Sequence, residues 1–506
     1  MEHFIAAFHL FFQVPVFFST FLGVLIGIIM GSIPGLTATM AIALIIPMTF
    51  YLSPIVSISM LVGAYKGGCL GGSIPAILLN TPGTPAAAAT VLDGHEMAKK
   101  GQALKALKMS IHASVLADSF SDIVLILIAP PLALIALKMG PPEMASLIIF
   151  SLMIITAVAG SSLTRGIIAG ILGLIVATVG LDPMLGTRRF GFGFMELDEG
   201  IALMPMLIGL FAVSEFFINA DKKMTGERIK MYKLSTNPDD NRVTREEFKR
   251  CLKIIASASV IGTILGAIPG IGPSIASFSS YAQAKKMSKE PERFGKGAIE
   301  GVAAAEAGNN AVVGANLIPL LTLGIPGDIG AAILLGAFMI QGLHPGPLLF
   351  KEHTDVIYAI FMSLLLANVF AHTIASVYIK FAAKIAGIPK WYIFPTVLAF
   401  CFVGVYGFNQ SVFDIWMALV FGLLGYILRK NGFPIAPLLI AFILEPILER
   451  AFRQSLLLSS GSMSIFLTRP ISLVFIIFTA ISILLLIRNA VKGKPAKLPF
   501  ESGDAI

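Results

Sequence analysis

The sequence predicts an all-α polytopic membrane protein made of two inverted-topology repeats, each with a re-entrant hairpin and a broken helix. Of its 506 residues, 56% are hydrophobic and only 13% are charged, with long apolar runs that no single soluble core would require. The motif Gly-x-x-x-Gly-x-Ile-Pro-Gly occurs at 27–35 and again at 262–270. Matched helix breakers in two halves of an apolar chain are typical of secondary transporters whose site lies between related repeats.

A second set of breakers follows each motif at matched spacing. Pro75 and Pro82-Gly83 follow the first motif as Pro319 and Pro326-Gly327 follow the second. The most polar stretch of the chain lies between the two copies, and its many Lys and Arg residues assign it to the cytoplasm by the positive-inside rule. We therefore expect a first transmembrane repeat at 1–220, a cytoplasmic linker at 221–253 and a second transmembrane repeat at 254–506.

The flanks of the two motifs predict that the hairpins enter the membrane from opposite sides. Pro269-Gly270 lies between Lys253 and Lys285, which belong to the same side, and the apolar arms around it are too short to span a bilayer. The flanks of Pro34-Gly35 carry no Lys or Arg, so this hairpin is expected to enter from outside. Further short basic runs are assigned to the cytoplasm together with the C-terminus: 99–108, 285–296, 380–390, 429–430 and 488–497. Arg188-Arg189, expected on the outer side, is the exception.

The remaining apolar segments thread between these two sides. They are 55–98, 102–138, 143–160, 164–181 and 200–219 in the first repeat, and 296–342, 352–386, 390–407, 411–428, 433–449 and 465–488 in the second. The N-terminus has neither a basic n-region nor a small-residue cleavage site, so no removable signal peptide is expected. Cys69, Cys251 and Cys401 are widely separated, which predicts neither a disulfide framework nor a zinc site.

Pro-Gly breaks inside membrane helices leave backbone polar groups that hydrocarbon cannot satisfy, so they must face protein or a wet cavity. After each break the helix restarts at a residue suited to an N-cap or a first turn. These restarts are near Thr37, at Thr84-Pro85, at Gly272-Pro273 and near Asp328. Four helix N-termini near mid-membrane would suit a carboxylate, and the freed carbonyl groups would suit Na⁺.

The candidate site residues flank these breaks. The breaks themselves are at Pro34, Gly35, Pro82, Pro269, Gly270 and Pro326. The candidate substrate-binding residues are Thr37, Thr39, Lys66, Asn80, Thr81, Gly83, Thr84, Gly272, Ser274, Asn309, Asn310, Gly327 and Asp328. A Na⁺ site with unspecified ligands is expected near Pro34, Asn80, Pro269 and Pro326.

The alternative interpretation is that Gly27, Gly31, Gly262 and Gly266 are small-xxx-small packing contacts and that the prolines only kink helices. Packing is the better explanation for one such motif alone. Four breaks in two matched pairs reverse that preference. Nearby polar residues remain either site residues or partners in hydrogen bonds between helices: Asn80, Thr81, Glu306, Asn309 and Asn310.

Charged residues within apolar segments need separate explanations, because each costs roughly 2.5 to 3.5 kcal/mol even on the insertion scale. Asp118 and Asp122, one helical turn apart, either form a proton or cation site or face another polar helix. Lys66 either meets a substrate carboxylate or pairs with Asp328. Glu215 is expected near the cytoplasmic interface.

The chain resembles the large membrane subunit, of the TctA type, of the tripartite tricarboxylate transporter family. The resemblance covers nearly the whole chain and is carried by motifs at 31–39, 71–85, 180–193, 266–274, 306–310 and 321–327. It implies an elevator-like importer of a tricarboxylate-like carboxylate in the bacterial inner membrane, driven by a Na⁺ or H⁺ gradient. It also implies a small transmembrane subunit and a periplasmic substrate-binding protein as partners, and it leaves a homodimer of the complex open.

This sequence departs from the pattern of the family at Lys66, at Asp328 and at Asp118 with Asp122, where less charged residues are usual. These departures put citrate as the substrate in question.

Two other classes of function compete with a transporter. An ion or solute channel can also use hairpins with facing N-termini. An intramembrane enzyme is less favoured, since the sequence has no His-Glu-x-x-His, Gly-x-Ser-x-Gly or Gly-x-Gly-Asp motif and no phosphate loop. We therefore expect no catalytic residues, no cofactor and, despite the net charge of +8, no nucleic acid partner, because the basic residues lie in short loops.

Overall fold

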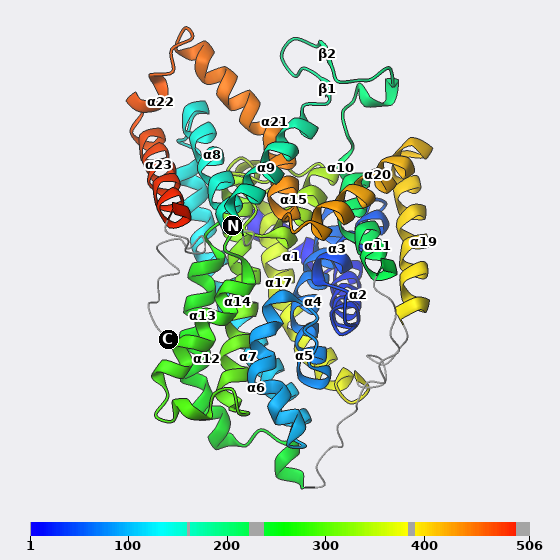
Figure 1. Cartoon of the computed structure of the whole chain (residues 1–506), viewed down its shortest axis with the longest axis vertical. Coiled ribbons are helices and arrows are strands. Elements are labelled where there is room, and N and C mark those ends of the chain that lie inside the picture. Colours follow the sequence, from blue (N-terminus) through cyan, green and yellow to red (C-terminus); the bar gives the residue numbers. More distant parts are fainter. Residues whose placement is uncertain (1, 159–161, 222–236, 383–389, 492–506) are drawn as a thin grey trace. The chain divides into compact units, whose positions relative to one another are not determined.

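Helices form nearly all of the described part of the chain, which comprises residues 2–158, 162–221, 237–382 and 390–491 of this computed structural model (Figure 1). Within these residues, six helical stretches are long and apolar enough to cross a membrane. They are Val14–Gly31, Pro54–Leu79, Ala103–Ala136, Leu203–Asp221, Thr354–Tyr378 and Val412–Lys430. The chain is therefore an all-α polytopic membrane protein, as its composition predicts.

The helices pack into two compact units, and each unit takes elements from both halves of the sequence. Unit 1 comprises Met1–Pro131, Asn219–Ile268 and Gly272–Gly404, and unit 2 comprises Leu132–Ile218, Pro269–Ile271 and Val405–Ile506. The two compact units therefore do not correspond to the first and second halves of the sequence. The repeat boundaries at 220 and 254 stay a prediction.

The described elements of unit 1 are α1 (Glu2–Phe11), α2 (Val14–Gly31), α3 (Ala38–Thr49), α4 (Pro54–Gly71), α5 (Ser73–Leu79), η1 (Pro85–Ala87), α6 (Ala88–Lys99), η4 (Pro238–Asn241), α12 (Arg245–Gly266), α13 (Gly272–Met287), η5 (Pro291–Arg293), α14 (Ile299–Leu323), α15 (Ile329–Ile340), α16 (Leu349–Glu352) and α17 (Thr354–Tyr378). Those of unit 2 are α8 (Pro141–Val158), α9 (Leu163–Ala177), β1 (Gly180–Leu181), β2 (Arg188–Arg189), η2 (Met195–Leu197), α10 (Leu203–Ile208), the π-helical turn η3 (Gly209–Val213), α20 (Val412–Lys430), α21 (Ile435–Leu458), α22 (Ile465–Thr468) and α23 (Pro470–Val491). Three helices have residues in both units: α7 (Ala103–Ala136), α11 (Ser214–Asp221) and α19 (Lys390–Asn409).

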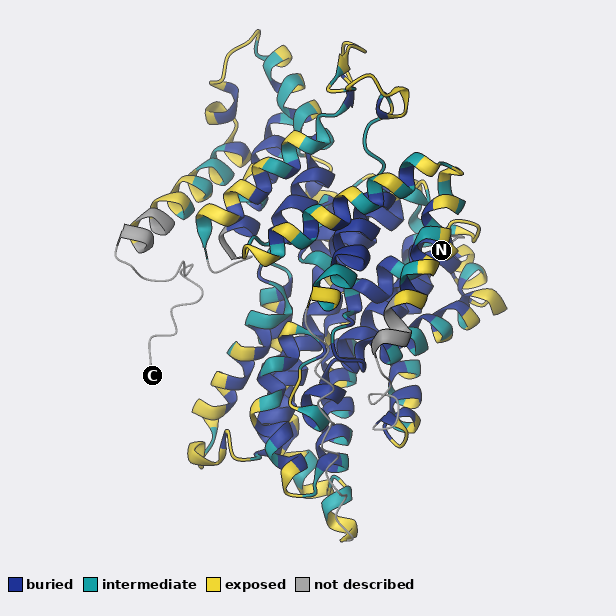
Figure 2. Cartoon of the chain, turned by 45° about the vertical axis from the view of Figure 1, so that its right-hand side comes forward, coloured by how far each residue is buried: buried dark blue, intermediate teal, exposed yellow. Residues whose placement is uncertain are grey.

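Helices α4 and α14 form the interior of unit 1. All residues from Ile55 to Gly71 on α4, and all from Ile299 to Thr322 on α14, are buried (Figure 2). Helix α2 packs along α4, and α12 packs along α14. The Pro-Gly breaks follow directly after the ends of α2 and α12, so these two helix pairs fix their positions.

Glycines allow the close approach within both pairs. A Cβ atom on Gly27 would lie 2.4 Å from the carbonyl oxygen of Ala64, and one on Gly262 would lie 2.6 Å from that of Gly308. Such distances leave no room for a side chain, so the small-xxx-small interpretation of these glycines is correct. The prolines do more than kink helices, since the helices end at the breaks.

The two motifs form helix–turn–helix segments. In the first, α2 ends at Gly31, Gly35 has a positive φ of 93°, and α3 begins after Thr37. In the second, α12 ends at Gly266 and α13 begins at Gly272. Gly270 lies between these two helices with a φ of 89°. Only glycine adopts this left-handed backbone without strain, which explains the Gly that follows each Pro.

The other two breaks also share one geometry. Helix α5 ends at Asn80 with a left-handed φ of 57°, and α14 ends at Gly324 with a φ of 72°. Four residues later Thr84 and Asp328 serve as N-caps of the next helical turns, η1 and α15. The apolar segments 55–98 and 296–342 are therefore each interrupted by a helix break.

The predicted linker at 221–253 is described only in part, since 222–236 lies outside the described residues, as do parts of the basic runs, 383–389 and 492–497. Helix α12 begins at Arg245, inside the predicted linker. A capping box starts it: Thr244 Oγ1 accepts from the Glu247 N–H, and the Glu247 carboxylate accepts from the Thr244 N–H at 2.8 Å. The Thr-x-x-Glu pattern thus starts the helix in polar sequence, earlier than 254.

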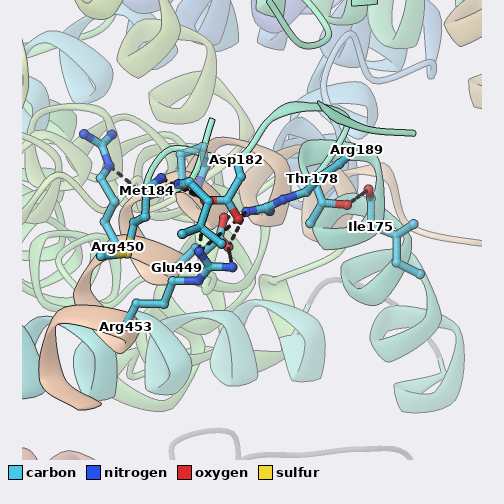
Figure 3. A network of polar contacts seen from close by, with 10 residues as sticks. Ile175, Thr178, Asp182, Met184, Arg189, Glu449, Arg450 and Arg453 are labelled. Atoms are coloured by element: carbon cyan, nitrogen blue, oxygen red, sulfur yellow. Dashed lines mark hydrogen bonds and ion pairs between the residues drawn. The ribbon is translucent and has the colours of Figure 1, made fainter. Parts of the chain in front are cut away.

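In unit 2 a β-hairpin carries Arg188-Arg189, the exception to the charge assignment. Strand β1 pairs with β2 in antiparallel register, and Asp182 lies directly after β1. Arg189 donates to Asp182 and, at 2.9 and 3.1 Å, to Glu449, while Arg453 donates to both oxygens of Asp182 at 3.0 Å (Figure 3). The charge of Arg189 is therefore balanced within the protein.

Asp182 is the centre of this network. Burial by itself would raise the pKa of Asp182, but hydrogen bonds from the backbone N–H groups of Leu185 and Met184 and from Arg189 and Arg453 bring the pKa well below its ordinary value. A carboxylate with a lowered folded pKa stabilises the folded form above its unfolded pKa and loses that contribution as the pH falls through the folded pKa.

We predict that the β1–β2 hairpin loses stability as the pH falls below about 4, the ordinary pKa of Asp. Hydrogen exchange of the Met184 and Leu185 amides, corrected for its intrinsic pH dependence, measures this loss directly. Asp182→Asn should leave these amides weakly protected at every pH. Protection in the unmodified protein that stays constant down to about pH 3 would contradict the prediction.

Candidate functional site

The helix restarts after the breaks form the candidate site. Thr37 Oγ1 accepts from the Met40 N–H at 3.3 Å, and Asp328 Oδ1 accepts from the Ala331 N–H at 2.8 Å. Thr84 caps η1 in the same way. Side-chain oxygens thus satisfy some of the N–H groups that a helix start leaves free.

Elements that contain these restarts pack against each other within unit 1. Helix α3 packs against α15, and α13 packs against η1. A Cβ atom on Gly272 would lie 4.0 Å from the Cβ of Asp328, so the starts of α13 and α15 are neighbours. Segments that are far apart in the sequence, at 37–49 and 329–340 for example, therefore meet at the breaks.

The predicted substrate residues differ in accessibility. Asn80 and Thr81 are exposed, and a second group is half-buried, comprising Thr37, Thr39, Thr84, Gly272, Ser274 and Asp328. Buried residues are Lys66, Gly83, Asn309, Asn310 and Gly327. The helix starts are therefore partly exposed, whereas Lys66 and the two asparagines are enclosed by the protein.

Two backbone carbonyl groups lie against the breaks in corresponding ways. A Cβ atom on Gly83 would lie 2.4 Å from the carbonyl oxygen of Gly31, and one on Gly327 would lie 3.1 Å from that of Gly266. Gly31 and Gly266 are the last residues of α2 and α12, where the helix dipole is negative. Among the described residues, no group of three or more His, Cys, Asp or Glu side chains could hold a metal ion. The Na⁺ site near Pro34, Asn80, Pro269 and Pro326 stays a prediction.

Lys66 does not pair with Asp328, so that expectation was wrong. Its Nζ lies 2.8 Å from Asp118 Oδ1 and 2.7 Å from Asp122 Oδ2, and it donates to Asn368 Oδ1 at 3.1 Å. Asn368 in turn donates to Asp122 at 2.7 Å, and all four side chains are buried. Residues four apart on a helix share one face, and the carboxylates of α7 point to α4 and α17.

Asp328 has a different partner. Tyr65 donates its hydroxyl to Asp328 Oδ2 at 2.6 Å, and Asn316 donates to the Tyr65 hydroxyl oxygen at 3.1 Å. The other oxygen, Asp328 Oδ1, caps α15, where the positive end of the helix dipole stabilises a carboxylate. A carboxyl group of the protein therefore already occupies the N-terminus of α15.

Glu306, in one of the family motifs, is buried on α14 among hydroxyl groups. Thr90 donates to Oε1, and Ser114 donates to Oε2 at 3.1 Å. Asn310 donates to Ser114 Oγ at 2.8 Å, whereas neither polar atom of the Asn309 side chain has a hydrogen-bond partner among the described residues.

Asp93 on α6 connects this helix to α13 and to the residues directly before α14. Its Oδ1 accepts three backbone N–H bonds of 2.8 Å, from Gly295, Gly297 and Ala298, and its Oδ2 accepts from Tyr281 at 2.8 Å. Helix α6 is thereby fixed to α13 and to the start of α14. The sequence analysis did not single out Asp93, Tyr65, Thr90, Asn316 and Asn368. A search for charged and amide side chains within the apolar segments would have found Asp93, Asn316 and Asn368.

A family model described as "Tripartite tricarboxylate transporter TctA family" matches residues 17–440. The chain is 38% identical, over 89% of each chain, to an uncharacterized 52.8 kDa protein of the TAR-I ttuC' 3' region of Agrobacterium vitis. It is 37% identical to a protein of the TAR-II ttuC' 3' region of the same organism, over 46% of this chain and 96% of the relative. No solved structure matches.

We predict that Lys66→Met lowers the free energy of unfolding by about 3 to 5 kcal/mol, because it leaves the buried carboxylates unpaired. Adding Asp122→Asn should restore part of the loss, giving a coupling energy above about 1 kcal/mol in a double-mutant cycle. The control pair Lys66→Met with Asp328→Asn should be additive, since these side chains have separate partners. Reversible unfolding in detergent measures both cycles, and equal coupling in the two would contradict the assignment.

Proposed function

Because the chain belongs to the tripartite tricarboxylate transporter TctA family, we propose that it is the large membrane subunit of a secondary transporter that imports a tricarboxylate-like solute together with a cation. The observation that carries this proposal is the meeting of the helix restarts in unit 1, with half-buried polar residues around them. Helix starts present N–H groups and a positive dipole end, which together favour a carboxylate.

The start of α13 is the best docking point for a substrate carboxylate. Gly272 has no side chain to cap the helix, and the first N–H groups of a helix have no partner within it. Ser274 adds a half-buried hydroxyl one residue beyond Pro273. The Asp328 side chain already caps the neighbouring start of α15. The substrate carboxylates would therefore bind at the starts of α13 and α3 and at the turn after Thr84.

The balance of buried charge favours cation-coupled import. Asp93, Asp118, Asp122 and Glu306 bring four buried carboxyl groups into unit 1, Asp328 adds a half-buried one, and Lys66 compensates only part of their charge. An uncompensated charge in a low-dielectric interior is very costly. An incoming carboxylate would add to this excess of negative charge, so we expect Na⁺ or H⁺ to accompany it.

The paired geometry of the breaks supports inverted repeats with an elevator-like cycle. Left-handed ends at Asn80 and Gly324 each precede a side-chain N-cap by four residues, at Thr84 and Asp328. The bacterial inner membrane, with the 221–253 linker and the C-terminus in the cytoplasm, is the location that fits such an importer. Its partners would be a small transmembrane subunit and a periplasmic substrate-binding protein that delivers the carboxylate.

We predict that the complex, reconstituted in vesicles with its small subunit, catalyses counterflow of a labelled di- or tricarboxylate. Counterflow requires alternating access, so a channel would not give it. Ser274→Ala should raise the KM for uptake several-fold, in the range of one lost hydrogen bond of about 1 kcal/mol. The matched control is Ser257→Ala on α12, whose hydroxyl donates only to the Met287 sulfur. Unchanged kinetics in Ser274→Ala would place substrate elsewhere.

Opposite insertion of the two hairpins is a separate prediction. Single cysteines at Tyr51 and Ser288, in a background without the three native cysteines, should react from the periplasm and from the cytoplasm respectively. Both positions are accessible enough for labelling, and Cys69, Cys251 and Cys401 are buried. Labelling of both from one side would exclude inverted repeats.

A further inference from the structure

Glu306 differs from the other buried carboxyl groups of unit 1 in the nature of its partners. Asp118 and Asp122 face the Lys66 ammonium, Asp93 accepts three backbone N–H bonds, and Asp328 caps a helix. Among the described residues, Glu306 takes part in no ion pair, and its oxygens accept from the neutral hydroxyls of Thr90 and Ser114. A lone carboxylate in such a setting is costly, so Glu306 must bind a cation to become neutral.

The contacts around Glu306 favour a proton over a metal cation. Thr90 Oγ1 and Ser114 Oγ each bind one of the two carboxyl oxygens by a direct hydrogen bond. Na⁺ would have to push these oxygens apart to sit among them. A proton adds to the carboxyl group without extra space.

A chain of hydroxyl groups surrounds Glu306. Ser110 also interacts with the Glu306 carboxyl group, and its Oγ shares a hydrogen bond of 2.8 Å with Ser73 Oγ. Ser114 accepts from Asn310. Hydroxyls both donate and accept, so they can pass a proton along such a chain by rotating. Ser73 begins α5, the helix that ends at the exposed Asn80. Residues 74–79 of α5 are apolar, but Gly72, directly before Ser73, lies against the break at Thr84, because a Cβ atom on Gly72 would lie 2.9 Å from Thr84 Oγ1.

We propose that Glu306 is the group that takes up and releases the proton coupled to solute import. The inference rests on the proposed function and adds to it the identity of the coupling ion and its residue. A proton moves from water to a Glu306 oxygen on one side of the cycle and returns to water on the other, so no bond other than O–H is made or broken. The substrate carboxylate docks at the helix starts and remains chemically unchanged.

Most titratable groups on the elements around α14 have partners of their own, and Asp328 of α15, for example, accepts from Tyr65. Lys66 with Asp118 and Asp122 form the cluster between α4 and α7, and Tyr281 of α13 donates to Asp93 of α6. His95 of α6 contacts the carbonyl oxygen of Ile77 at 3.1 Å. Cys69 of α4 is a buried thiol.

The test uses Glu306→Gln, because glutamine imitates the neutral carboxyl group in size and polarity. In vesicles containing the complex, counterflow should stay within about twofold of the unmodified protein, whereas accumulation driven by a pH gradient should be lost. The matched control is Glu300→Gln on the same helix, whose carboxylate pairs with Arg250 at the helix start. That variant should keep accumulation driven by the pH gradient.

A second variant keeps the carboxyl group and so guards against a folding defect in the first. Thr90→Val removes the hydroxyl that donates to Oε1, a bond that favours the charged form, so the pH of half-maximal uptake should move upward. Accumulation in Glu306→Gln that still follows the pH gradient, or uptake driven equally by Na⁺ in both proteins, would overturn the inference. Absence of counterflow in the unmodified complex would instead refute the proposed function.

Discussion

The membrane interior offers no water to backbone groups, so each helix break must be satisfied inside the protein. The protein does this with a small set of local devices. Asn80 and Gly324 end helices in the left-handed conformation, and Thr84 and Asp328 cap the helices that follow. Glycines bring the broken segments so close that the carbonyl oxygens of neighbouring helix ends lie against them. The helix starts that follow the breaks pack against each other within unit 1, and the candidate site is made of them.

Buried charges obey the same constraint and tie the helices together. Lys66 joins α4 to α7 and α17 through Asp118, Asp122 and Asn368, at distances from 2.7 to 3.1 Å. Such a cluster is poor as a source of net stability, because desolvation offsets much of the attraction. Loss of a single member of the cluster is nevertheless strongly destabilising, because it leaves the other buried charges unpaired. Asp93 acts similarly on the loop before α14, where three N–H groups need an acceptor.

The contrast between Glu306 and Asp328 shows how surroundings give two carboxyl groups different roles. Asp328 meets a helix N-terminus and a tyrosine hydroxyl, which stabilise it as an anion. Glu306 meets only neutral groups, which suits a carboxyl group that alternates between neutral and charged forms. In the proposed cycle Asp328 forms part of the docking region, and Glu306 carries the proton.

The sequence by itself determined the membrane class, the positions of the breaks and the family, because composition, Pro-Gly motifs and their spacing are local properties. It left the partners of buried polar residues open. From the sequence, Lys66 either met a substrate carboxylate or paired with Asp328, and only the tertiary structure showed that Asp118 and Asp122 of α7 are its partners. Tyr65 and Thr90 gave no signal, since their roles depend on Asp328 and Glu306, which lie more than 200 residues away in the chain. Local backbone chemistry can be read along the chain, whereas charge compensation depends on which helices pack side by side.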